Sequence, residues 1–178
     1  MHRQAQTLIA QVIILSSVVL FTTIFFHAPA KGSSSLPSAP AGTSMYGLSF
    51  TDYAGNEVHL YDFRRKPLVV YTWASWCPYC GAEMQHLAEV QSQYGDKIQI
   101  VAINRGEARA TAKNFTDHLS VSDKLIILLD PADAYFKQIG GYAMPETLYI
   151  NAAGETAAHT RGPSKPADVD SNLKNIAN

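Results

Sequence analysis

The sequence predicts an α/β fold in which helices flank a mixed central sheet, preceded by one transmembrane helix. Three features support this prediction: strand and helix patterns alternate between residues 45 and 178, a short turn joins the last two strand patterns, and the chain opens on a long apolar segment. Alternating strands and helices form parallel crossovers, whereas strands joined by a short turn pair in antiparallel fashion. The expected sheet therefore contains both strand directions.

Residues 1–26 predict a short cytoplasmic stub followed by a membrane anchor. Residues 7–26 carry no charged side chain, and twenty helical residues rise about 30 Å, the thickness of the hydrocarbon core of a bilayer. Arg3 precedes this segment and Lys31 follows it, so the positive-inside rule places the N-terminus in the cytoplasm. A cleaved signal peptide is the alternative. Either way the rest of the chain is exported, and a retained anchor predicts a single-pass protein of the cell membrane.

Residues 27–44 predict a flexible linker, and residues 45–178 predict the folded domain. The linker reads HAPAKGSSSLPSAPAGTS, and this mixture of Ala, Ser, Pro and Gly offers little to bury in a core. The whole chain is 47% hydrophobic, which is enough for a globular domain. Its formal net charge of -1 gives no reason to expect a nucleic-acid partner.

The first part of the domain predicts a hairpin and then alternating buried strands and helices. Short strand patterns at 49–51 and 58–59 flank the turn-rich sequence DYAGNE. Residues 68–73, LVVYTW, are β-branched and aromatic, which is typical of a buried strand. The patterns that follow predict a helix over 78–94, a strand over 98–103, a helix over 108–119 and a strand over 125–129.

The last part of the domain predicts a helix, two paired strands and a closing helix. Asp130 and Pro131 are typical of a helix start, with an Asp cap and proline at the first helical position. Gly140 and Gly141 are expected to end that helix. Strands over 147–150 and 156–160 flank the turn 151–154, and a helix is expected over 166–176.

The two cysteines of the chain, Cys77 and Cys80, lie where a buried strand meets a helix. A sulfur at this position faces the unpaired N–H groups and the positive end of the helix dipole, and both favour the nucleophilic thiolate. Pro78 suits the first helical turn because its missing N–H would have had no partner there. Cys80 follows nearly one turn later, so the two sulfurs can close a small ring. Such a ring adds little stability but can form and open, which indicates redox catalysis.

A structural disulfide and a metal site are the two alternative roles for the cysteine pair. A structural disulfide is disfavoured, because the stabilisation from closing a loop grows with loop length. A zinc site needs four ligands, and the histidines of the domain, at positions 59, 86, 118 and 159, do not show the usual ligand spacing. A metal-binding or metal-delivery module that uses the two thiols remains an alternative function. For redox catalysis we expect no cofactor and no metal.

The domain resembles the thioredoxin superfamily, and within it the membrane-anchored TlpA/ResA-like thiol–disulfide oxidoreductases. The most specific part of the resemblance is a Cys-x-x-Cys motif after a strand, followed later by Met144-Pro145 before the strand ETLYI. The resemblance is carried by LVVYTWASW with CPYCGAEM, IQIVAINRGEARATAKNF, DPADAYFKQIGGYAMPETLYINAAGE and Gly162. It implies a three-layer thioredoxin-like fold and a protein-disulfide oxidoreductase.

The resemblance also implies partners. Protein thiols and disulfides would be the substrates, including those of apocytochrome c haem sites in cytochrome c biogenesis. A membrane thiol carrier would supply the electrons.

Pro145 matches the cis-proline that faces the Cys-x-x-Cys motif in this superfamily. A cis bond at this position would turn the backbone of Met144 outward. The N–H and C=O of Met144 could then pair with an extended segment of the partner. An ordinary trans proline at the start of a strand is the alternative.

Glu83 matches a glutamate that often follows the motif in this subfamily. It lies three residues after Cys80 and shares its helix face. A partly desolvated carboxyl group would have a raised pKa and could accept the proton of the Cys80 thiol, whereas a solvated helix glutamate would have no such role.

Trp76, Pro78 and Tyr79 are expected to surround the sulfurs and contact the substrate.

Three departures from the subfamily pattern leave the direction of the reaction open. Pro78 stands first in the dipeptide rather than second, Gly81 replaces a commonly basic residue, and Tyr71 replaces a buried acid found in many thioredoxins. A change of 30 mV in reduction potential corresponds to about 1.4 kcal/mol, so one or two interactions could reverse the direction. We expect a reductase, with a disulfide-forming oxidase as the alternative.

Overall fold

The structure is a computed structural model that describes residues 45–177. The expected anchor at 1–26 and linker at 27–44 lie outside the described residues. Within residues 45–177, the helices are too short or too polar to cross a bilayer.

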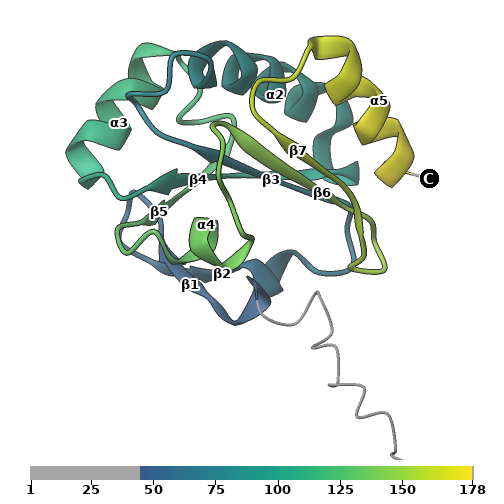
Figure 1. Ribbon diagram of the computed structural model, residues 1–178, viewed down its shortest axis with the longest axis horizontal. Helices are drawn as coiled ribbons and strands as arrows, with labels where there is room; N and C mark the ends of the chain where they lie inside the picture. The colour runs from purple at the N-terminus through teal and green to yellow at the C-terminus, as the bar shows by residue number, and fades with distance from the viewer. Residues whose placement is uncertain (1–44, 178) are drawn as a thin grey trace, which may run out of the picture. The chain divides into compact units, whose positions relative to one another are not determined.

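The described residues form one seven-stranded mixed sheet, as predicted (Figure 1). β3, β4 and β5 run parallel, β6 is antiparallel to β3, β7 is antiparallel to β6, and β1 is antiparallel to both β5 and β2. The strand order is β2-β1-β5-β4-β3-β6-β7. The strands are β1 (Ser49–Thr51), β2 (Glu57–His59), β3 (Leu68–Trp73), β4 (Gln99–Arg105), β5 (Ile126–Asp130), β6 (Glu146–Ile150) and β7 (Thr156–Arg161).

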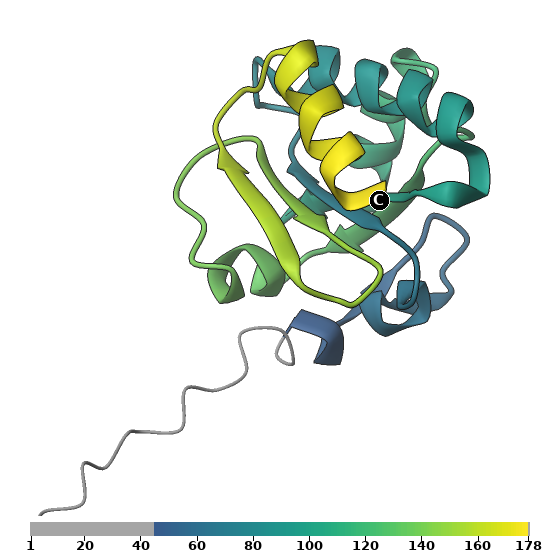
Figure 2. The same cartoon turned by 90° about the vertical axis from the view of Figure 1, so that its right-hand side faces the viewer.

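Helices cover both faces of the sheet, so the fold has the three layers that the thioredoxin resemblance implies. The helices α2, α3 and α5 pack on one face of the sheet (Figure 1), and α5 is the yellow helix in the foreground of Figure 2. The short helix α4 and the 3-10 helices η1 and η2 lie on the other face (Figure 1). Their bounds are α2 (Cys80–Tyr94), α3 (Arg109–His118), α4 (Ala134–Gln138), α5 (Pro166–Ala177), η1 (Met45–Gly47) and η2 (Leu60–Phe63).

The strand β3 joins the two halves of the core because its side chains alternate between the faces of the sheet. Val69, Tyr71 and Trp73 pack beneath α2 and α5, whereas Leu68 and Val70 pack on the side of α4. All six residues of β3 are buried. Burying a large apolar side chain contributes about 1.5–3 kcal/mol, so this strand is a rigid base for the segment that follows it.

The helix α2 begins at Cys80 and not at Pro78 as predicted. The N–H of Cys77 donates to the carbonyl of Ala74 at 3.1 Å, and the N–H of Cys80 donates to the carbonyl of Cys77 at 3.3 Å. These bonds span three residues, so the Cys-x-x-Cys segment forms turns before the helical i→i+4 pattern starts. Proline fits such a turn as well as it fits a first helical position, which is why the sequence could not separate the two.

The prediction that Asp130 caps a helix beginning at Pro131 is also wrong. Asp130 ends β5, and its carboxylate accepts the N–H of Tyr135 at 2.8 Å across four intervening residues. The residue at the helix start is Asp133, which has a left-handed backbone with φ 53° and ψ 36°. Its side chain forms an ion pair with Arg105 at 2.6 Å. This long-range pair and the left-handed backbone delay the helix to Ala134.

Candidate active site

Cys77 and Cys80 form a disulfide at the carboxyl end of β3, just before α2, as the sequence predicted for a redox pair. The S–S distance is 2.07 Å and the two Cα atoms are 5.4 Å apart. β3 lies inside the sheet between β4 and β6, so loops that follow or precede these strands meet at the disulfide. Across residues 45–177, three or more His, Cys, Asp or Glu side chains do not gather into a metal-binding group.

The two sulfurs differ in accessibility. Cys77 is 3% exposed and Cys80 is fully buried. Trp76 and Tyr79, on either side of Cys77 in the chain, are 62% and 58% exposed. Cys77 is therefore the more accessible of the two cysteines, and exposed aromatic residues precede and follow it closely in the chain.

The backbone around Cys77 favours a negative charge on its sulfur after reduction. Cys77 lies three residues before the first residue of α2, with Tyr79 as the N-cap. The first turn of a helix has N–H groups without intrahelical partners, and they carry a partial positive charge. A thiolate beside them is stabilised relative to a thiol, so Cys77 has the surroundings of an attacking sulfur.

Glu83 is a buried carboxyl group one turn beyond Cys80. It is 7% exposed, and its oxygens accept the N–H of Ser164 at 3.0 Å and the hydroxyl of Thr147 at 3.4 Å. Burial raises the pKa of Glu83 above its usual value, and the two hydrogen bonds only partly oppose that effect. The solvated alternative is therefore excluded, and the group is suited to take up and release a proton.

Tyr71 occupies the position where many thioredoxins have a buried acid. Its hydroxyl donates to the carbonyl oxygen of Cys80 at 2.9 Å. Burial raises the pKa of Tyr71 well above its usual value, so this group stays neutral. Tyr71 thus positions the backbone of Cys80 without adding a charge, and the ionisable group beside this helix turn is Glu83.

The peptide bond between Met144 and Pro145 is cis, as the resemblance to the thioredoxin superfamily implied. Pro145 is buried, and the partly buried Met144 packs against the core cluster that contains both cysteines. The carbonyl oxygen of Pro145 accepts the N–H of Gly162 at 2.8 Å. Among residues 45–177, no hydrogen bond occupies the backbone N–H or C=O of Met144. Within these residues, the backbone edge of Met144 is therefore available for pairing.

The Redoxin family model matches residues 35–176 of this chain. The chain belongs to the Redoxin family. Among characterised relatives, the chain is 30% identical over 144 residues to the thiol:disulfide interchange protein DsbE of Vibrio cholerae, covering 79% of this chain and 76% of that protein. It is 24% identical over 175 residues to the thiol-disulfide oxidoreductase ResA of Geobacillus kaustophilus, covering 98% of both chains.

The solved structure of MTB dsbF has the same fold, with a TM-score of 0.69 at 19% identity, covering 77% of this chain and 98% of that one. The Redoxin family match and the ResA and DsbE relatives, rather than this fold similarity, identify the chain as a thiol–disulfide oxidoreductase of the ResA/DsbE type.

Glu107 is a site residue of this Redoxin-family chain that the sequence analysis did not single out. One carboxylate oxygen accepts the N–H of Ser75 at 2.8 Å and the side-chain amide of Asn104 at 2.6 Å. The other accepts the hydroxyl of Ser75. Glu107 follows β4, which runs parallel to β3, so both strand ends lie at one edge of the sheet. That topology was the signal that could have placed Glu107 beside the loop leading to Cys77.

Glu146 is a second such residue, on β6, which lies on the opposite side of β3 from β4. It follows Pro145 and begins β6, and its side chain is completely buried. One oxygen accepts the N–H groups of Tyr142 and Ala143 at 2.7 and 2.9 Å. The sequence offered no local signal for this arrangement, because a glutamate that starts a strand is usually solvated.

A pocket of about 250 Å³ opens beside the disulfide. It is bordered by Pro78 and Tyr79 from the redox motif, and by Glu83. Its other lining residues are Ala82, His86, Pro163, Ser164, Pro166 and Val169. The predicted substrate-contacting residues Pro78 and Tyr79 thus lie at its rim, while the exposed Trp76 does not line it.

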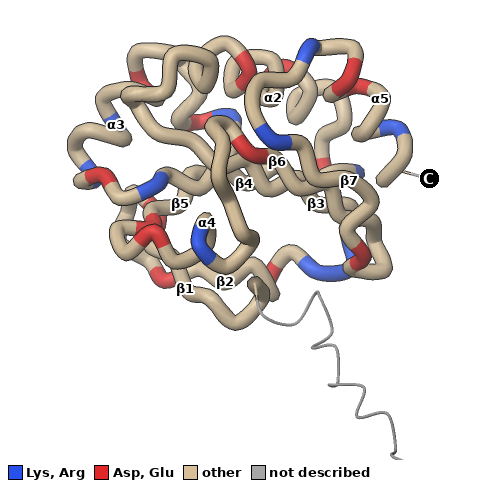
Figure 3. The backbone as a smooth tube through the Cα atoms, in the orientation of Figure 1, with Lys and Arg blue, Asp and Glu red and all other residues tan. Residues whose placement is uncertain are grey.

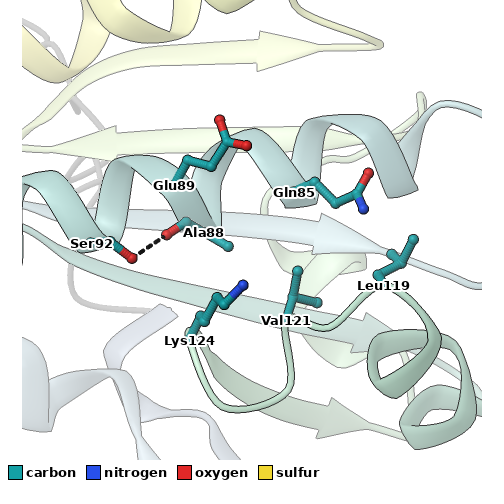
Figure 4. Close-up of a pocket in the computed structure, with 7 residues that line it drawn as sticks. All are labelled: Gln85, Ala88, Glu89, Ser92, Leu119, Val121 and Lys124. Carbon is teal, nitrogen blue, oxygen red and sulfur yellow. Dashed lines mark hydrogen bonds between the residues drawn. The ribbon is translucent and has the colours of Figure 1, made fainter.

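A larger pocket of about 440 Å³ lies between α2 and the segment after α3 (Figure 4). Gln85, Glu89 and Lys124 give it polar walls, and Ser92 donates a hydrogen bond to the carbonyl of Ala88 at 3.0 Å. Neither cysteine lines it. It also contains no other residue of the Cys-x-x-Cys motif, whereas Pro78 and Tyr79 line the smaller pocket, so the reactive chemistry is assigned to the disulfide region.

Proposed function

We propose that this chain is a membrane-tethered reductase of protein disulfides on the extracytoplasmic side of the cell membrane. The observation that carries the proposal is the Cys77–Cys80 disulfide, in which Cys77 is 3% exposed and Cys80 fully buried. It follows the end of β3, which pairs with the start of β6, the strand that the cis Met144–Pro145 bond precedes. The apolar segment 7–26 supports the tether, since it has the length and composition of a membrane span.

In the proposed reaction the reduced enzyme transfers two electrons to a partner. The Cys77 thiolate attacks one sulfur of the partner's disulfide, forming a mixed disulfide and releasing the partner's other sulfur as a thiolate. Cys80 loses its proton and attacks the sulfur of Cys77. The Cys77–Cys80 bond forms, the mixed disulfide breaks, and the partner leaves with two reduced sulfurs. A membrane thiol carrier would then reduce the enzyme again.

Glu83 is the group that we assign to the proton of Cys80. The Cys80 thiol is fully buried, so bulk water cannot serve it directly. The raised pKa of Glu83 brings the carboxyl group closer to the operating pH, where a general base works best. Catalytic roles are thus assigned to Cys77, Cys80 and Glu83.

The substrate contacts that we propose favour an extended polypeptide. The exposed Trp76 and Tyr79 and the rim residue Pro78 would pack against side chains around the partner's disulfide. The N–H and C=O of Met144, which make no hydrogen bond within residues 45–177, would pair with the partner's backbone. The family resemblance makes the haem-site cysteines of apocytochrome c, in cytochrome c maturation, the substrate that we propose to test first.

Trapping of the mixed disulfide tests this function. Cys80→Ala removes the resolving sulfur, so partners should remain bound to Cys77 and appear as reducible adducts on nonreducing gels of membrane fractions. The matched control is the double variant Cys77→Ala/Cys80→Ala, which should trap nothing. Absence of adducts in Cys80→Ala cells, together with no disulfide turnover by the purified protein, would contradict the proposal.

A disulfide-forming oxidase is the second candidate. Gly81 argues against the oxidase and favours the reductase. A basic residue there would stabilise the Cys77 thiolate and raise the reduction potential, whereas glycine adds no charge. Equilibration with glutathione buffers measures this directly. A potential near that of thioredoxin supports the reductase, and one far higher supports the oxidase. Stoichiometric retention of copper(I) or zinc without reductase activity would instead support a metal-binding module.

A further inference from the structure

Glu146 is a buried carboxylate that directly follows the cis Met144–Pro145 bond in the chain. A carboxylate that is removed from water costs free energy unless it is paired and hydrogen-bonded. Both oxygens of Glu146 are used. Oε1 accepts the N–H of Tyr142 at 2.7 Å and of Ala143 at 2.9 Å, and Oε2 lies 2.8 Å from Nε2 of His159 and 3.9 Å from Nε of Arg161.

These contacts connect three parts of the fold. Glu146 begins β6 and Arg161 ends β7, the neighbouring strand of the sheet (Figure 3). The strand register pairs the same two residues. Glu146 therefore fastens the loop before Pro145 to β7 as well as to the strand that it begins.

The loop that Glu146 holds contains the free backbone edge of Met144. The two N–H groups bound by the carboxylate belong to the two residues just before Met144, and the N–H of Gly162 binds the carbonyl of Pro145 just after it. The backbone on both sides of Met144 is thus fixed, while its own N–H and C=O make no hydrogen bond within residues 45–177. Charge-assisted bonds to backbone N–H groups are among the stronger hydrogen bonds in proteins.

We propose that Glu146 is a positioning residue that presents the Met144 backbone to an extended polypeptide substrate. This inference rests on the proposed function. Glu146 does not touch the reacting sulfurs; it acts through the loop 142–145. It therefore serves the binding of polypeptides that pair along this edge, and it contributes little to small disulfides, which only need access to Cys77.

The same loop carries a second feature for substrate contact. Tyr142 is 78% exposed, although its backbone N–H is bound to the buried carboxylate. The guanidinium of Arg161 lies 5.3 Å from the centre of its ring. Holding the backbone of Tyr142 therefore also places an exposed aromatic ring two residues before Met144, where it can pack on a polypeptide.

The test compares a disulfide-bonded polypeptide, insulin, with a small disulfide, 5,5′-dithiobis(2-nitrobenzoate), as substrates of the full-length protein. We expect Glu146→Ala to raise KM for insulin about tenfold, because about one hydrogen bond to the substrate is lost or misaligned. The kcat for insulin and the rate with the small disulfide should both stay close to wild type. Glu146→Gln, whose amide oxygen can still accept the two N–H groups, should recover most of the KM. Glu57→Ala, at an exposed glutamate on the distant edge strand β2, is the matched control and should behave as wild type.

Several outcomes would overturn the inference. Equal losses with both substrates, or a loss confined to kcat, would show that Glu146 only supports the fold or the reacting sulfurs. An unchanged KM for insulin in a folded Glu146→Ala variant would show that the loop is positioned without it. If Glu146→Ala does not fold, His159→Gln replaces it in the test. This variant keeps the two N–H bonds to Glu146 and removes its imidazole partner. It must raise KM for insulin by less than tenfold and leave the rate with the small disulfide unchanged. A wild-type protein inactive with both substrates would refute the proposed function itself.

Discussion

Replacing Glu83 with glutamine separates the proton-transfer role of this carboxyl group from its contribution to packing. The amide is nearly the same size, and its oxygen can still accept the N–H of Ser164, which now lies 3.0 Å from the carboxylate. It cannot take up a proton at neutral pH. A general base contributes about 10²–10⁴-fold to the step that it serves. We therefore expect Glu83→Gln to slow the attack of Cys80 by about 100-fold or more, while the first attack by Cys77 is nearly unchanged.

Rapid acid quenching followed by mass spectrometry measures this prediction, because it counts the mixed disulfide at each time of reaction with a disulfide-bonded polypeptide. The mixed disulfide should be short-lived in the wild type and should accumulate in Glu83→Gln. Glu89→Gln, at an exposed position on the same helix, is the matched control and should not accumulate it. Decay of the mixed disulfide at the wild-type rate in Glu83→Gln, at every pH tested, would refute the assignment of the base.

The same variant tests the sign of the pKa shift through stability. Burial raises the pKa of Glu83 above its ordinary value of 4.5, so the folded protein binds the proton more tightly than the unfolded chain. The resulting stabilisation is fully present below pH 4.5 and is lost as the pH rises through the folded-state pKa. A difference of one pKa unit between the two states corresponds to about 1.4 kcal/mol. Urea unfolding should therefore show Glu83→Gln gaining stability relative to wild type as the pH rises from 4.5; parallel stability curves would contradict the shift.

Two further substitutions test the surroundings of Cys77. Glu107→Ala leaves the N–H of Ser75 and the amide of Asn104 without an acceptor. We expect urea unfolding to show that the free energy of unfolding falls by about 1–3 kcal/mol for each group left buried and unpaired. An unchanged free energy of unfolding would show that water replaces the carboxylate. Gly81→Lys adds a cation next to Cys80, and a Cβ there would lie 3.5 Å from the ring of Phe115, an ordinary contact. If the cation favours the thiolates by about 1 kcal/mol, equilibration with glutathione should give a potential about 20 mV higher, and a lower one would contradict the electrostatic argument.

Local sequence was sufficient to predict most of the fold and the centre of the site. The strand LVVYTW is β-branched and aromatic throughout, so it belongs in the interior whatever surrounds it. The Cys-x-x-Cys spacing brings Cys77 and Cys80 together through the geometry of a single turn. The cis bond before Pro145 was predicted by resemblance, on the order of the motifs along the chain.

Long-range contacts decided the remaining features, because they join residues that no local pattern connects. Glu83 is buried by Thr147 and Ser164, which are 64 and 81 residues away in the chain, and it is this burial that raises its pKa. Glu107 reaches Ser75 only because β3 and β4 end at one edge of the sheet. Glu146 is held by β7, and the start of α4 is set by Arg105 on β4. A helix or strand pattern reports which side of an element is apolar, whereas the partner of a buried charge depends on which elements the folded sheet brings side by side.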